Sequence, residues 1–138
     1  MPQLPEVRRR PVDSEKITIN LGHVDLGQVD LLVHDGFYAN RTDFIRTAIR
    51  NQLERHSDAV RQSVQRQQLQ LGLREYDRAE LEAAVAAGHS LHIQVLGLAV
   101  IAPDVPAELA REAIGSLHVL GALQASPAVK AALSDRIR

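Results

Sequence analysis

The chain has 138 residues, a length that suits one domain or two small ones. Aromatic residues make up 3% of the sequence and tryptophan is absent, so aliphatic side chains must form the core. The formal net charge of −1 at pH 7 argues against binding nucleic acid through overall charge, so any such contact requires a local basic surface.

Residue types and patterns that are missing from the sequence exclude several kinds of site and of protein. The chain contains no cysteine, which excludes disulfides, thiolate metal sites and a cysteine nucleophile. No apolar run reaches the length of a membrane span, and the N-terminus lacks the apolar core of a signal peptide. We therefore expect a cytoplasmic protein without a membrane partner.

Residues 1–13, MPQLPEVRRRPVD, hold three prolines and three consecutive arginines. This composition predicts a mostly flexible basic arm. Two readings of the arm remain open. Arg8, Arg9 and Arg10 could track DNA phosphates, or the segment could be a solvated tail.

A strict alternation of apolar and polar residues follows the arm. One side of it consists of Ile17, Ile19 and Leu21, and the other of Lys16, Thr18 and Asn20. A period of two is typical of a half-buried β-strand with its polar side outward.

The next two segments have helical periodicity. Leu26, Val29, Leu32 and Val33 recur at helical spacing, and Gly36 ends this run. Asn40 with Asp43 predicts the start of a second helix. The apolar stripe of that helix consists of Phe44, Ile45, Ala48, Ile49 and Leu53.

The segment from 14 to 56 thus reads strand, helix, helix. A lone strand leaves both backbone edges unpaired, and so small a unit cannot bury enough apolar surface. Two copies solve both problems, because their strands can pair antiparallel across a two-fold axis and pack on four helices. We expect an intertwined homodimer.

Residues 15–56 resemble the ribbon-helix-helix family of DNA-binding repressors. The resemblance depends on the strand KITINL, the helix that ends at Gly36, and the turn GFYANRTDFIR that follows. It implies that the paired strands enter the DNA major groove. The residues that match the base readers are Lys16, Thr18 and Asn20; those that match the phosphate-binding positions are Asn40, Arg41 and Thr42.

Physical chemistry supports these roles. A two-stranded ribbon fits the major groove, where lysine can donate to guanine, asparagine can pair with adenine, and threonine can contact a thymine methyl. The alternative is that the three polar residues form an ordinary solvated strand face. Gly22 and His23 depart from the family pattern, in which many members carry proline and an acidic residue after the strand.

Residues 57–76 are polar and rich in glutamine, which predicts a helical connector. Residues 77–138 contain an internal repeat, because Val95-Leu96-Gly97 recurs as Val119-Leu120-Gly121 at an offset of 24. The pattern there is helix, strand, helix, strand, helix, with two apolar strands typical of a parallel sheet buried on both faces. We predict a small α/β repeat module that mediates oligomerisation, in a chain that is mostly α with short β.

The sequence supports a metal site or an enzyme site less well than it supports DNA binding. His89, His92 and His118 invite a metal interpretation, and one branch of the family senses nickel with several histidines and a cysteine. This chain has no cysteine and its C-terminal pattern differs, so we expect no metal and no cofactor. Neither a glycine-rich phosphate loop nor a nucleophile triad is recognisable, so we expect no enzyme activity.

The sequence therefore predicts a sequence-specific transcriptional repressor. Its expected partners are double-stranded operator DNA with palindromic or repeated half-sites and further copies of itself, as a homodimer and a homotetramer or higher. The alternatives are the antitoxin of a toxin–antitoxin pair and a regulator that responds to a metal or ligand. An apolar, repeat-like C-terminus favours self-association over the short polar tail that is usual in such antitoxins.

Overall fold

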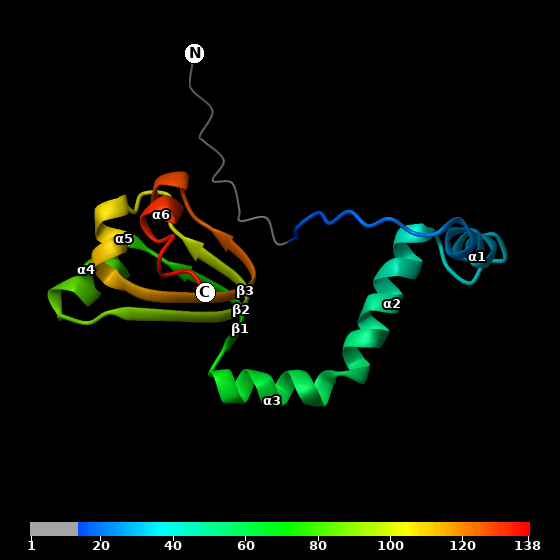
Figure 1. Cartoon of the computed structure of the whole chain (residues 1–138), viewed down its shortest axis with the longest axis horizontal. Helices are drawn as coiled ribbons and strands as arrows, with labels where there is room; N and C mark the ends of the chain where they lie inside the picture. Colours follow the sequence, from blue (N-terminus) through cyan, green and yellow to red (C-terminus); the bar gives the residue numbers. More distant parts are fainter. Residues whose placement is uncertain (1–13) are drawn as a thin grey trace, which may run out of the picture. The chain divides into compact units, whose positions relative to one another are not determined.

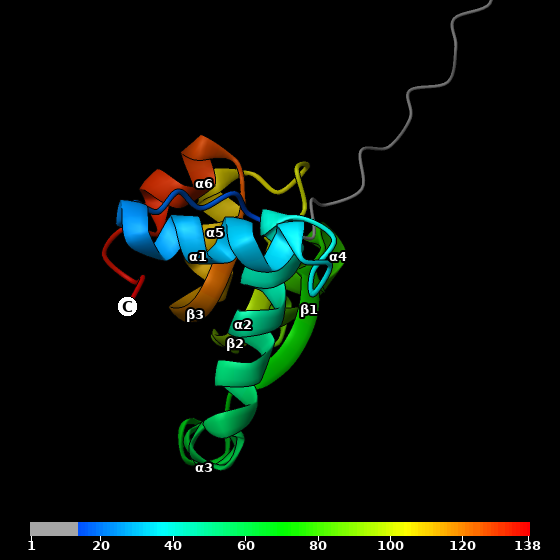
Figure 2. The ribbon, with the colours of Figure 1, turned by 90° about the vertical axis from the view of Figure 1, so that its right-hand side faces the viewer.

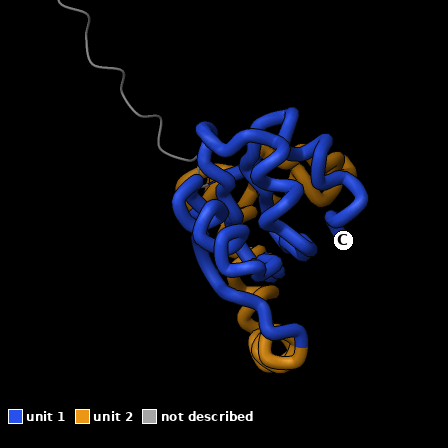
Figure 3. Tube along the Cα trace, turned by 90° about the vertical axis from the view of Figure 1, so that its left-hand side faces the viewer, with its two compact units in different colours: residues 1–15, 67–138 blue, residues 16–66 orange. Residues whose placement is uncertain are grey.

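The computed structural model describes residues 14–138, so the predicted arm at residues 1–13 lies outside the described residues. Two compact units make up the structure (Figure 3). Residues 16–66 form a helical unit. Residues 67–138, together with Ser14 and Glu15, form the second, which we call the sheet unit.

The helical unit consists of α1 (His23–His34), α2 (Arg41–Arg55) and α3 (Ser57–Gln67), with the last residue of α3 counted in the sheet unit (Figure 1). The start of α2 confirms its predicted cap. Asn40 Oδ1 accepts a hydrogen bond of 2.8 Å from the backbone nitrogen of Asp43. In return, Asp43 Oδ2 accepts one of 2.9 Å from the backbone nitrogen of Ala39. Two backbone amides at this helix start, those of Ala39 and Asp43, thus have a side-chain partner.

The predicted strand at residues 16–21 is not a strand in the single chain. Residues 14–22 have no regular secondary structure. A strand is defined by its ladder of hydrogen bonds to a neighbour, and our prediction assigned that neighbour to a second chain. The pairing therefore stays a prediction.

The sheet unit contains three parallel strands, β1 (Gln70–Tyr76), β2 (Leu91–Ile101) and β3 (Ile114–Gln124), in the order β1-β2-β3. The helices α4 (Arg78–Ala86), α5 (Ala107–Ala113) and α6 (Pro127–Ala132) follow them in turn. This order confirms the predicted alternation from residue 77 onward. It also corrects the predicted helical connector at 57–76, because its last seven residues form β1, which adds a strand to a fold that is mostly helical in our prediction.

All three helices of the sheet unit lie on one face of the sheet (Figure 1). Each crossover leads to the next strand in the same direction, and right-handed crossovers then place every helix on the same side. The core lies between this face and the helices, and its fully buried side chains include Leu81, Ile93, Val95, Ala110, Leu117 and Leu133. A single chain covers one face of the sheet; burial of the second face by copies from other chains stays a prediction.

A row of glycines crosses the sheet and fixes its register. Gly72 pairs with Gly97, and Gly97 pairs with Gly121. All three have positive φ angles, of 105°, 139° and 121°. A Cβ atom on Gly97 would lie 2.3 Å from the carbonyl oxygen of Gly72, and one on Gly121 would lie 2.1 Å from that of Gly97. Only glycine fits, because the strands approach each other with no room for a side chain.

The last residues cover part of the outer edge of β3. The backbone nitrogen of Leu117 donates to the oxygen of Arg136 at 3.0 Å, and that of Arg138 donates to the oxygen of Leu117 at 2.8 Å. Arg111 Nη1 lies 2.9 Å from Asp135 Oδ1, and this hydrogen bond holds the pKa of Asp135 below its usual value. These contacts hold the tail on an edge that would otherwise expose unpaired backbone groups.

We predict that Gly97→Ala destabilises the sheet unit by about 2 kcal/mol or more, because it adds a steric clash to an unfavourable φ angle. Gly72→Ala is the matched control, since it has a similar φ angle but no atom within 4 Å of the added Cβ. It should cost about 1 kcal/mol less. Urea unfolding followed by circular dichroism measures both, and equal losses would contradict the role assigned to close approach.

Candidate nucleic-acid interface

The three predicted base readers lie on the segment that precedes α1. Lys16, Thr18 and Asn20 are all exposed. They alternate with apolar residues that are exposed as well: the side chain of Ile17 is 72% accessible and that of Ile19 is 59% accessible. If this segment is extended, its polar and apolar side chains point in opposite directions.

The helical unit leaves most of its apolar side chains uncovered. Among residues 16–66, Val29 is the single hydrophobic residue that is buried. The large hydrophobic residues that remain exposed there are Ile17, Ile19, Leu21, Val24, Leu31, Phe37, Ile49, Leu53 and Val60. A unit with so small a core lacks the buried area that a fold of this size needs, so these side chains require a partner surface.

The turn between α1 and α2 carries the predicted phosphate contacts. The side-chain oxygen of Asn40 is used in capping α2, and its amide group retains two hydrogens that can donate to an anion. Thr42 is exposed in the first turn of α2. The backbone amides of a helix start and the positive end of the helix dipole favour an anion at this place.

Arg41 forms an ion pair that the sequence reasoning missed. Its Nε lies 2.7 Å from Asp30 Oδ1, and its Nη2 lies 2.8 Å from Asp30 Oδ2. The hydrogen bond lowers the pKa of Asp30 and raises that of Arg41. The pair joins α1 to the start of α2. Two of the five donors of the guanidinium are therefore occupied, and the remaining ones are available for a phosphate.

The two groups of candidate residues remain separate in the single chain. Within residues 14–138, no hydrogen bond or ion pair joins Lys16, Thr18 or Asn20 to the turn residues. The candidate arm contacts Arg8, Arg9 and Arg10 lie outside the described residues. The ion pair of Arg41 had no local signal, because Asp30 lies eleven positions away in the sequence.

The histidines considered as metal ligands lie in the sheet unit. His92 Nδ1 is 2.8 Å from Ser116 Oγ, and the sheet register places His118 opposite Gln94. In the part of the chain that the structure describes, no group of three potential ligands lies close enough to hold a metal ion. No helix within the same residues is long and apolar enough to cross a membrane.

Comparison with known proteins gives one match. The model of the Ribbon-Helix-Helix transcriptional regulator family matches residues 12–130, which include the base-reader segment, the turn and all three strands of the sheet. Searches of curated proteins and of solved structures give no match. Because the family match extends over most of the chain, the protein belongs to the ribbon-helix-helix transcriptional regulators, a family of DNA-binding proteins.

Proposed function

We propose that the chain is a sequence-specific transcriptional repressor that reads operator DNA with the paired segments 16–21 of two copies. The observation that carries this proposal is the alternation of exposed apolar and exposed polar side chains on these residues. Together with the family match, this pattern supports a ribbon with one side for the protein core and one for DNA.

Dimer formation supplies the partner surface that the helical unit lacks. Two antiparallel segments would pair their backbone groups and bring Ile17, Ile19 and Leu21 of both copies against the helices. The exposed side chains of Leu31, Ile49 and Leu53 would then be covered as well. Folding and association are therefore coupled, and the free single chain should be only marginally stable.

The polar side of the ribbon suits the major groove. Residues on one side of a strand are about 6.5–7 Å apart, which is close to two base steps of about 3.4 Å. Lys16 can donate to guanine O6 or N7, Asn20 can form two hydrogen bonds with adenine, and Thr18 can bond or contact a thymine methyl. The protein would distinguish the operator sequence through these contacts with the edges of the bases.

The turn residues would hold the DNA backbone on each side of the ribbon. Asn40, Arg41 and Thr42 offer an amide, a partly free guanidinium and a hydroxyl at the start of α2. Asp30 and Asp43 reduce the positive charge there, so backbone amides must contribute much of the attraction. The arginines of the arm, Arg8, Arg9 and Arg10, would add contacts that carry no sequence information.

The sheet unit would mediate self-association of the dimers. Two dimers joined in this way bind two half-sites together, and the second binding event benefits from a high effective concentration. Repression then follows from stable occupancy of an operator with palindromic or repeated half-sites.

The first prediction concerns base reading. The double variant Lys16→Ala/Asn20→Ala should lose the preference for operator over random DNA, since each lost base contact costs about 1–3 kcal/mol. The fold should be retained because both side chains are exposed. Titration at fixed salt measures the preference. The matched control is Lys130→Ala/Asn51→Ala, which removes the same residue types from exposed positions on helices; full specificity in the first variant would refute the assignment.

The second prediction concerns the dimer. Ile19→Lys should abolish the folded dimer and DNA binding together, because it places an unpaired charge in the shared core. Thr18→Lys is the matched control on the opposite side of the segment and should leave a helical dimer. Circular dichroism and analytical ultracentrifugation distinguish the two. A stable dimer of the Ile19→Lys variant would contradict the proposed ribbon.

The third prediction concerns the sheet unit. A chain that ends at Arg66, the last residue of the helical unit, should form dimers that still recognise a single site. It should lose both the tetramer and cooperative binding to two sites. Sedimentation and gel-shift titration on one-site and two-site DNA measure these properties, and unchanged cooperativity would argue against self-association through residues 67–138.

A further inference from the structure

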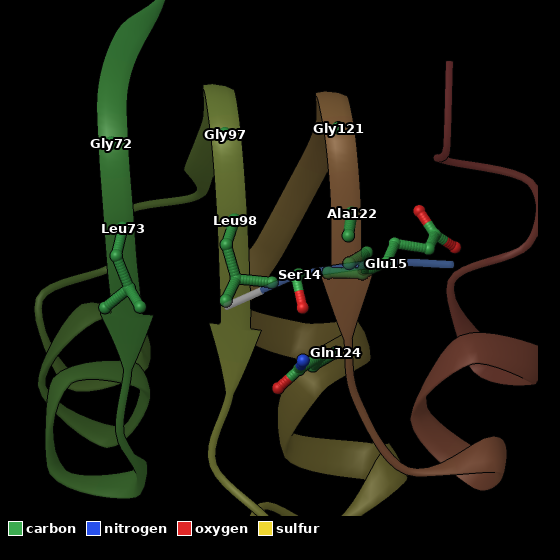
Figure 4. A pocket seen from close by; sticks show the side chains of 10 residues that line it. Ser14, Glu15, Gly72, Leu73, Gly97, Leu98, Gly121, Ala122 and Gln124 are labelled. Atoms are coloured by element: carbon green, nitrogen blue, oxygen red, sulfur yellow. The ribbon is translucent and has the colours of Figure 1, made fainter. Parts of the chain in front are cut away.

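The face of the sheet that the helices leave open carries two apolar rows. Strand pairing aligns Leu71 with Leu96 and Leu120, and Leu73 with Leu98 and Ala122. These positions alternate with the buried residues Val95 and Ala99, so they lie on the side opposite to the helices. Figure 4 shows Leu73, Leu98 and Ala122 side by side on the three strands.

This leucine face, by which we mean the six residues of the two rows, is uncharged; Leu71, Leu73 and Leu120 are exposed, and the other three residues are half-buried. Leu71 is 67% accessible, Leu73 51% and Leu120 45%. Polar residues border it at both ends: His92 with Ser116 and Gln94 with His118 at one end, and Glu75 and Gln124, which flank the buried Val100, at the other. An apolar centre with a polar rim is the arrangement found in protein interfaces.

We propose that the leucine face packs against the same face of a second copy of this chain. Parallel sheets occur almost always with both faces covered, and here the helices cover one. A second copy offers what the face requires, namely matching apolar rows without charge. Two such faces can stack about 10 Å apart, with their side chains interdigitated around a two-fold axis.

The N-terminal arm is a poorer occupant of the leucine face. Ser14 and Glu15 line a pocket on this face together with Leu73, Leu98 and Ala122 (Figure 4). Residues 1–13 contain three consecutive arginines and three prolines, however, and few apolar side chains. Covering leucines with this segment would desolvate charges that have no partner on the two apolar rows.

The size of the face explains why it would act only in an assembly. Strand spacing and rise give it a flat area on the order of 200 Å² in each copy. Stable complexes bury about 1,200–2,000 Å² in total, so one such contact cannot hold two free chains together. The inference thus rests on the proposed dimer, because two dimers with two sheet units each can make two contacts at once.

The first test uses the full chain with Leu71→Glu/Leu120→Glu. Both positions are exposed, so the sheet unit should still fold, whereas the charges would repel across the contact. Sedimentation should change from four chains to two, with single-site DNA binding retained. The matched control Ala83→Glu/Ala131→Glu adds the same charges to exposed positions on α4 and α6 and should remain tetrameric. An unchanged tetramer of the leucine variant would overturn the inference.

The second test uses the absence of native cysteine. Leu98→Cys lies on the central strand of the leucine face, and Ala83→Cys lies on the helix side. A bismaleimide that spans about 10 Å should link two chains of the first variant and not of the second. If the two chains are linked but the protein sediments as a dimer, the contact between leucine faces is supported and the proposed tetramer is refuted. If the cysteine at position 98 neither reacts with the alkylating reagent nor links two chains, a segment of the same chain covers the leucine face. That result would overturn the inference.

Discussion

Burial of apolar surface that one chain leaves exposed is the constraint on which the helical unit depends. A core with a single buried hydrophobic side chain, Val29, cannot offset the entropy lost by ordering three helices. The capping hydrogen bonds at Asn40 and the ion pair of Asp30 with Arg41 determine local geometry, but exposed interactions of this kind add little stability. In the function that we propose, DNA recognition is therefore coupled to association, because the surface that would read bases forms only when two copies pair.

Local chemistry explains which elements could be predicted from the sequence. The caps at Asn40, Asp77 and Ser126 each accept a backbone hydrogen bond as their residue types predict. The offset of 24 also agrees with the pairing of Val95 with Val119. Long-range features were harder to predict: Asp30 and Arg41 meet because two helices pack, and the segment 16–21 needs a partner that a single chain does not contain.

The strand β1 was missed although the sequence contains a signal for it. Leu71-Gly72-Leu73 matches Leu96-Gly97-Leu98 at an offset of 25, one residue longer than the repeat that was recognised. The glutamine-rich segment before it favoured a helix, and the strand itself is exposed apart from Tyr76. An edge strand has one neighbour, and β1 buries only Tyr76, so its hydrophobic pattern is weaker than that of the central strand β2. The missed strand is also why the open leucine face could not be anticipated.

The covered edge of β3 has a consequence for how this sheet could change in length. The tail from Arg136 to Arg138 bonds to Leu117 and occupies that part of the outer edge of β3, while a glycine in each strand lies opposite the glycine of the next. A duplicated repeat inserted between β1 and β3 would meet a matching glycine on both sides and leave the covered edge intact. The unit is in this respect a short solenoid with one capped end, and its length can vary internally without disturbing the tail.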